Sequence, residues 1–301
     1  MTILHVVILA IVQGLAELLP VSSSAHVVVT EKLMGLDPTA PEMTLLLVML
    51  HTGTMLAVIV YFWKQWARMY FQNMETFKRF AVLLIAATAL TGIIGEALIK
   101  AIEKFGFHGA QGAEVEQLFG RLDLIAPALA AGGLLILIAG IYERRHASSY
   151  TPAYAGGGTP RIGTSTGSMN MKQGALIGIV QAFCLPFRGF SRSGATISTG
   201  LLAGVEKSRA EAFSFALAVV LTPAADGREL LRLMKAEHVS GGPGLAIAMM
   251  PSLLGMACAF VAGLLALQWL SKWLESDRWY LFGIYCLVAA VAVGFLSHAG
   301  Y

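Results

Sequence analysis

Residues 43–63 read MTLLLVMLHTGTMLAVIVYFW, a run without any Lys, Arg, Asp or Glu. A helix needs about 20 such residues to cross the hydrocarbon core of a bilayer. Runs of similar character occupy 81–102, 124–142, 245–270 and 279–298, and shorter or interrupted apolar stretches occupy 3–35 and 173–225. This pattern predicts a helical protein that crosses a membrane several times.

The composition of the 301-residue chain excludes an ordinary soluble domain. Hydrophobic residues make up 56% of the chain, charged residues 13%, and the mean hydropathy is +0.70. Soluble domains carry about 25% charged residues. The formal net charge of +3 is modest and its basic residues are scattered, so we expect the bilayer, and no nucleic acid, as a partner.

Among the loops between apolar runs, two carry several basic residues each: Lys64, Arg68, Lys78 and Arg79 in the first, and Arg144, Arg145, Arg161 and Lys172 in the second. Because short cytoplasmic loops carry the excess of Lys and Arg, both loops are predicted to be cytoplasmic, and 103–123 external. Residues 147–171 form a linker rich in Gly, Ser, Thr and Pro. The linker divides the chain into a first half, 1–146, and a second half, 172–301.

The two halves resemble each other at their beginnings. Segment 11–26 reads IVQGLAELLPVSSSAH and segment 179–194 reads IVQAFCLPFRGFSRSG. A shift of 168 residues aligns identical residues at Ile11, Val12, Gln13 and Ser23. We therefore predict an all-α integral membrane protein built as an inverted-topology repeat, with about six spanning helices and two re-entrant hairpins at 1–35 and about 173–206.

The first hairpin contains the polar residues Gln13, Glu17, Ser22, Ser23, Ser24 and His26. An ionisable residue at membrane depth costs about 2–3 kcal/mol on insertion scales, so such a cluster lines a cavity or has partners. The alternative is that the serines only cap a helix broken at Pro20 and that Glu17 is paired structurally. Capping leaves Glu17 and His26 unexplained, so a functional site is favoured.

The second hairpin contains RGFSRSGAT at 188–196, which has the chemistry of an anion-binding turn. Gly189 and Gly194 permit close backbone approach, and the guanidinium of Arg192 suits phosphate oxygens. A helix that begins near Ser193 would add amide groups aimed at the same point. The alternative, a solvated turn, fits poorly between apolar flanks.

The motifs GLAELLPVSSSAH (14–26) and GFSRSGATISTGLLAG (189–204), with LHTGTMLAVIVYF (50–62) between them, resemble the bacterial undecaprenyl pyrophosphate phosphatase family associated with bacitracin resistance. The resemblance implies dephosphorylation of a C55 isoprenoid pyrophosphate to the monophosphate carrier of cell-wall synthesis, with a divalent cation, Mg²⁺ or Ca²⁺. It also implies a site open to the periplasmic side of the bacterial inner membrane, in a protein that is often a homodimer.

By this resemblance, Glu17, Ser23, His26 and Arg192 occupy the acidic, serine, histidine and arginine positions of the two signatures. Gln13 stands where many members have an acid, which leaves Glu17 as the only carboxylate of the first motif and the expected metal ligand. Arg188 stands where the family usually has proline. Its charge either assists pyrophosphate binding or extends to the membrane interface.

We expect Ser23 to be the nucleophile, His26 its base or the proton donor to the leaving group, and Arg192 with the cation to stabilise the transferred phosphoryl group. Direct attack by water activated by His26 is the alternative. The predicted substrate-binding residues are Gln13, Ser22, Ser24, Gly189, Ser191, Ser193, Gly194 and Thr196.

A lipid-phosphate transporter or flippase is the competing function, because inverted repeats with interrupted helices are typical of transporters. Three further ionisable residues are expected to lie outside the site. His51 is interpreted as a helix-end or packing histidine, Glu96 as the partner of Lys100 four residues later, and Asp226 as part of a turn at a span end.

Overall fold

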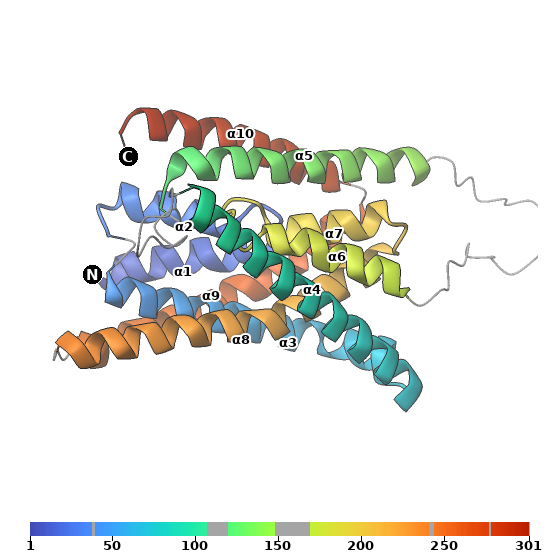
Figure 1. The fold of residues 1–301 in the computed structure, drawn as a ribbon, viewed down its shortest axis with the longest axis horizontal. Helices are drawn as coiled ribbons and strands as arrows, with labels where there is room; N and C mark the ends of the chain where they lie inside the picture. Colours follow the sequence, from blue (N-terminus) through green and yellow to red (C-terminus); the bar gives the residue numbers. More distant parts are fainter. Residues whose placement is uncertain (38–39, 107–119, 148–168, 241–243, 277, 301) are drawn as a thin grey trace, which may run out of the picture.

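The computed structural model describes residues 1–37, 40–106, 120–147, 169–240, 244–276 and 278–300. Every regular element in these ranges is an α-helix, which confirms the predicted fold class (Figure 1). The helices are α1 (Ile3–Leu18), α2 (Ser23–Leu33), α3 (Pro41–Tyr70), α4 (Met74–Gly106), α5 (Leu122–Ala147), α6 (Met171–Phe183), α7 (Arg192–Leu202), α8 (Lys207–Ser240), α9 (Gly244–Glu275) and α10 (Trp279–His298).

Six of these helices, α3, α4, α5, α8, α9 and α10, are long and apolar enough to cross a membrane. Five of them coincide with the long apolar runs of the sequence. The sixth, α8, has a mean hydropathy of 1.2 against 2.0–2.4 for the others, which is why its part of the sequence looks interrupted. The chain is a multi-pass membrane protein.

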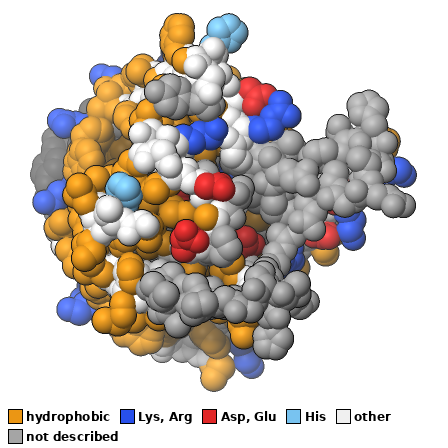
Figure 2. Space-filling view, turned by 90° about the vertical axis from the view of Figure 1, so that its left-hand side faces the viewer, with side chains coloured by type: hydrophobic (Ala, Val, Ile, Leu, Met, Phe, Trp, Pro, Cys, Tyr) orange, Lys and Arg blue, Asp and Glu red, His pale blue; other side chains and the backbone are white. Residues whose placement is uncertain are grey.

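The outer surface of the bundle is apolar, as lipid requires. Only 17% of the apolar window of α4 is buried inside the protein. Figure 2 shows the end of the molecule that carries both termini, where hydrophobic side chains cover much of the rim and charged side chains gather toward the middle and top. The exposed apolar side chains therefore face the lipid of the bilayer.

Four shorter helices form two pairs, α1 with α2 and α6 with α7. At 1.5 Å per residue, helices of 11–16 residues span roughly 17–24 Å, less than the roughly 30 Å of a hydrocarbon core. In Figure 1, α1 begins at the end of the bundle that carries both termini, and α6 begins at the opposite end. Re-entrant insertion and the inverted repeat remain predictions, and most of the 147–171 linker lies outside the described residues.

Close backbone contact fixes α3 beside α9. A Cβ atom on Gly53 would lie 2.2 Å from the carbonyl oxygen of Met256, so the two helices touch where only glycine fits, as small residues allow in membrane bundles. α9 also packs along α1, and α8 packs against α3 and α7. These contacts hold the ends of α1 and α7 against the same stretch of α3 and α8.

Candidate active site

The first polar motif forms the tip between α1 and α2. Glu17 lies in the last turn of α1, which ends at Leu18 before Pro20. Ser22 has a positive φ of 68° and makes no capping bond to α2, a conformation that residues with a side chain rarely adopt. The hydroxyl of Ser23 donates to Oε2 of Glu17 at 2.5 Å. The interrupted helix thus places a serine hydroxyl on a carboxylate.

The second polar motif forms the tip between α6 and α7. Ser191 is the N-cap of α7, and its hydroxyl accepts a hydrogen bond from the Gly194 amide at 3.2 Å. Gly189 has a φ of 108°, and a Cβ there would lie 2.6 Å from the carbonyl oxygen of Ile125. Glycine is therefore required at this turn. The turn and the cap present Arg192 as the first residue of α7.

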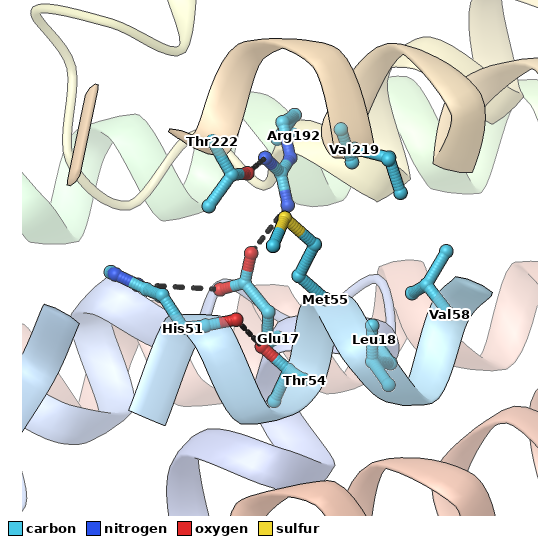
Figure 3. A pocket seen from close by; sticks show the side chains of 10 residues that line it. Glu17, Leu18, His51, Thr54, Met55, Val58, Arg192, Val219 and Thr222 are labelled. Atoms are coloured by element: carbon cyan, nitrogen blue, oxygen red, sulfur yellow. Dashed lines mark hydrogen bonds and ion pairs between the residues drawn. The ribbon is translucent and has the colours of Figure 1, made fainter. Parts of the chain in front are cut away.

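The two tips meet at one carboxylate (Figure 3). Nη2 of Arg192 donates to Oε1 of Glu17, and Nη1 donates to the hydroxyl of Thr222 on α8 at 3.0 Å. A second hydrogen bond joins the tips, since the backbone amide of Gly189 donates to the side-chain Oγ of Ser24 at 3.3 Å. The hydroxyl from α2 and the guanidinium from α7 thus contact the same carboxylate, which unites the two motifs predicted to share a site.

His51 and Asp226, which were expected to lie outside the site, also lie near Glu17. Nε2 of His51 lies 4.0 Å from Oε2 of Glu17, and Nδ1 lies 3.3 Å from Oδ1 of Asp226. His51 and Asp226 therefore belong to the site, and their interpretation as a packing histidine and a turn residue is corrected. The available signal was one ionisable side chain inside the apolar run 43–63 and another directly after the apolar stretch 173–225.

His26 is turned away from Ser23. Its Nδ1 lies 2.8 Å from the carbonyl oxygen of Ser22, and its Nε2 lies 2.7 Å from the hydroxyl of Tyr285 on α10. A carbonyl can only accept, so Nδ1 carries the proton and Nε2 accepts from the tyrosine hydroxyl. The predicted pairing of His26 with Ser23 as base and nucleophile is not the arrangement in this structure, because α10 supplies a competing partner.

The remaining predicted binding residues make structural contacts. Gln13 donates from Nε2 to Oε2 of Glu17 at 3.2 Å. The hydroxyls of Ser22 and Ser24 lie 3.3 Å apart, Ser193 donates to the carbonyl oxygen of Leu19 at 3.3 Å, and Thr196 lies 2.5 Å from the hydroxyl of Ser214. Phosphate contacts of this group remain predictions. The predicted Glu96–Lys100 pair is present at 3.5 Å.

A small cavity lies beside the Glu17–Arg192 pair, between α1, α3, α7 and α8 (Figure 3). Its volume of about 10 Å³ is close to the minimum that holds one water molecule. It is lined by Glu17, Leu18, His51, Thr54, Met55, Val58, Arg192, Ala218, Val219 and Thr222. The Glu17 carboxylate and the Arg192 guanidinium are therefore bound to each other, with room beside them for about one water molecule.

The protein ligands for a divalent cation are few. Among the described residues, no three His, Cys, Asp or Glu side chains are grouped to hold a metal ion. Both oxygens of Glu17 have partners, Arg192 on Oε1 and Ser23 with Gln13 on Oε2. A cation of the Mg²⁺ type binds through one or two carboxylates and takes its other ligands largely from water, so Glu17 would have to release one of these partners to hold it.

The sequence matches known proteins over most of its length. Residues 6–292 match the family described as bacitracin resistance protein BacA. The chain belongs to this family. It is 53% identical over 290 residues to undecaprenyl-diphosphatase 2 of Acinetobacter baylyi, across 95% of each chain. It is also 31% identical over 296 residues to undecaprenyl-diphosphatase of Rhodopirellula baltica, across 98% of each chain.

Another relative, undecaprenyl-diphosphatase of Gluconacetobacter diazotrophicus, is 33% identical over 313 residues, which cover 99% of this chain and 98% of the relative. The BacA match includes both hairpin tips, five of the six long apolar helices and α10 as far as residue 292. The family resemblance inferred from the two motifs is thus confirmed along the chain.

Proposed function

We propose that this BacA family member hydrolyses undecaprenyl pyrophosphate to undecaprenyl phosphate and inorganic phosphate, and so renews the lipid carrier for cell-wall synthesis. The observation that carries the proposal is the junction of the hairpin tips, where Ser23 and Arg192 contact opposite oxygens of Glu17. Glu17, as a proton acceptor, is thereby in contact with both a candidate nucleophile, Ser23, and a guanidinium that can bind phosphate, Arg192. The names of the relatives give the substrate.

Substrate binding exchanges the partners of Arg192. Its guanidinium is bound to Glu17 and Thr222, and the adjoining cavity is too small for a pyrophosphate. A guanidinium binds phosphate oxygens through two parallel hydrogen bonds. The incoming pyrophosphate would take the place of the Glu17 carboxylate on Arg192, and Thr222 would keep the guanidinium aimed at the site.

Phosphoryl transfer follows from the Ser23–Glu17 contact. Oε2 of Glu17 accepts the hydroxyl proton as Oγ of Ser23 attacks the terminal phosphorus, and the bond from that phosphorus to the bridging oxygen breaks to release undecaprenyl phosphate. Arg192 stabilises the negative charge on the transferred group. Water then hydrolyses the phosphoserine and releases phosphate. Direct attack by water is the alternative, distinguished by whether a phosphorylated Ser23 is found by mass spectrometry after rapid acid quench.

We propose Glu17 as the residue that would hold a divalent cation together with substrate phosphate oxygens. When bound, the cation supplies positive charge that neutralises the pyrophosphate. Gln13, being neutral, adds an amide oxygen at most. Titration of Mg²⁺ and Ca²⁺ into metal-free protein during the phosphatase assay tests this assignment.

We also propose that the two hairpins enter the bacterial inner membrane from opposite sides and that the site opens to the periplasm. The support is the placement of α1 and α6 at opposite ends of the bundle (Figure 1) and the basic loops of the sequence. In a variant without the native cysteines, an impermeant thiol reagent added to intact cells should label Asp37→Cys and miss Lys172→Cys. Light scattering of the purified protein tests the expected homodimer.

The decisive experiment for the activity measures phosphate release from undecaprenyl pyrophosphate by purified protein in lipid nanodiscs. We expect turnover that Arg192→Ala abolishes. A lipid-phosphate flippase is the competing function, and it requires no serine bound to a carboxylate. Movement of labelled lipid between leaflets without phosphate release would support the flippase and overturn the phosphatase.

A further inference from the structure

The side chains of His51 and Asp226 lie next to the proposed catalytic group but belong to neither hairpin. His51 is on α3, inside the apolar run, and Asp226 is on α8. They approach to 3.3 Å, between Nδ1 and Oδ1. Their side chains are only 32% and 15% exposed, so this contact is held inside the bundle rather than at a solvated surface.

One face of α8 supports both flanks of Glu17. Thr222 and Asp226 are four residues apart and therefore neighbours on that face. Thr222 accepts from Arg192, which contacts Oε1 of Glu17, and Asp226 holds His51, whose Nε2 faces Oε2. A helix outside the two hairpins thus organises the groups on either side of the carboxylate.

The orientation of the imidazole follows from its acidic partner. A carboxylate accepts a hydrogen bond from Nδ1–H, which fixes the ring and directs Nε2 toward the opposite side. That side is Oε2 of Glu17, the oxygen that accepts the Ser23 hydroxyl. The separation of 4.0 Å exceeds hydrogen-bond length, so His51 acts beside the Ser23–Glu17 contact without replacing it.

We propose that His51 and Asp226 form a positioning pair for phosphoryl transfer, in which Asp226 fixes the ring and the ring of His51, beside Oε2 of Glu17, keeps this carboxylate from turning away from Ser23. The pair also brings a second carboxylate to the site, in a chain whose first motif has the neutral Gln13 beside Glu17. This inference rests on the proposed phosphatase function.

Replacing His51 with Asn or Gln tests the roles of its two ring nitrogens separately. The amide nitrogen of Asn can replace Nδ1, whereas that of Gln reaches the position of Nε2. Because Nε2 faces Glu17, His51→Gln should keep several-fold more turnover than His51→Asn. Asp226→Asn should lower kcat by at least about tenfold, within the range for residues coupled in one network, and should change KM less than about threefold.

The pair should also behave as one unit. In the His51→Asn background, the Asp226→Asn change should add little further loss, because the residue that Asp226 positions is already gone. His5→Gln on α1 and Glu75→Gln in the exposed pair with Arg79 are matched controls that should leave kcat unchanged. Elution as a single species on size-exclusion chromatography establishes that each variant is folded.

Steady-state kinetics with farnesyl pyrophosphate as the substrate distinguish a positioning role of the His51–Asp226 pair from a purely structural one. A purely structural link between α3 and α8 predicts lower thermal stability with kcat within twofold of wild type in every folded variant, which overturns the proposal. Multiplying losses, or more turnover for His51→Asn than for His51→Gln, also overturn it. If His51→Asn fails to fold, Asp226→Asn and His51→Gln still test the kcat and KM pattern. Absence of phosphate release by the wild type instead rejects the proposed function.

Discussion

The two hairpin tips share a sequence pattern but differ in what their glutamines hold. Gln13 and Gln181 coincide under the shift of 168 residues, and both side chains are buried. Gln13 donates to Glu17, whereas Gln181 donates to the hydroxyl of Thr91 on α4 at 3.2 Å. The position that matches Glu17 in the second tip is Leu185. In the first tip the glutamine side chain binds the carboxylate of the proposed active site, whereas in the second tip it binds a neighbouring helix.

The serines of the two tips differ in the same way. Ser191 accepts from the Gly194 amide and so caps α7, while Ser23 makes no such cap and donates to Glu17. A serine hydroxyl becomes a nucleophile when a neighbouring base can accept its proton. This difference supports the proposed roles of Ser23 in the first tip as nucleophile and of Arg192 in the second as the phosphate-binding group.

The largest effect is expected from the cation of the second tip. Arg192→Ala should lower turnover on the order of 10³-fold or more, the range for a catalytic arginine in phosphoryl transfer. Arg192→Lys should fail to restore it, because an ammonium cannot donate to Glu17 and Thr222 with the fixed geometry of a guanidinium. Steady-state phosphate release measures both variants. Wild-type kinetics for the Lys variant would mean that charge alone matters.

Exchanging each serine for alanine tests the difference between the tips directly. Ser23→Ala should lower turnover by about 10²-fold or more, since proton transfer to a positioned base is lost. Ser191→Ala should mainly cost about 1 kcal/mol of stability through the lost N-cap. Thermal unfolding and phosphate release together separate these outcomes. Equal losses of turnover in folded variants would remove the distinction.

A smaller effect is expected at the histidine of the first tip. Tyr285→Phe removes the hydroxyl that donates to Nε2 of His26, a neutral hydrogen bond worth about 1 kcal/mol. Turnover should therefore fall less than about tenfold. A loss as large as that of Ser23→Ala would place the His26–Tyr285 pair in the chemical step.

The smallest effect on activity is expected for the pair of Arg188 in the second tip and the buried acid Glu31, whose substitution should mainly change stability. Glu31 on α2 is fully buried, neither carboxylate oxygen has a hydrogen-bond partner among the described atoms, and Arg188 is the cation whose charge acts on it. Arg188→Met should lower the melting temperature, because Glu31 loses the favourable attraction of the Arg188 charge. Adding Glu31→Gln should recover stability. A double variant less stable than Arg188→Met alone would reject this account.

The sequence predicts five of the six long helices well, because the length of their apolar runs decides them, whereas α8 has a mean hydropathy of only 1.2 and looks interrupted. It also indicates Glu17, Ser23 and Arg192, since polar residues at membrane depth are costly and their two motifs point to one site. The direction of His26 could not be predicted, because its partner Tyr285 is 259 residues away. His51 and Asp226 were placed outside the site because only the packing of α3 against α8 shows that they meet.

The central claim is that the two hairpin tips form a single catalytic unit, and a double-mutant cycle across them tests it most directly. Glu17→Gln removes the shared carboxylate from the first tip and Arg192→Gln the cation from the second, and phosphate release is measured for each variant and for both together. Groups that act as one unit show strongly non-additive losses. The account predicts that the double variant is about as slow as the slower single variant, whereas losses that multiply would contradict it.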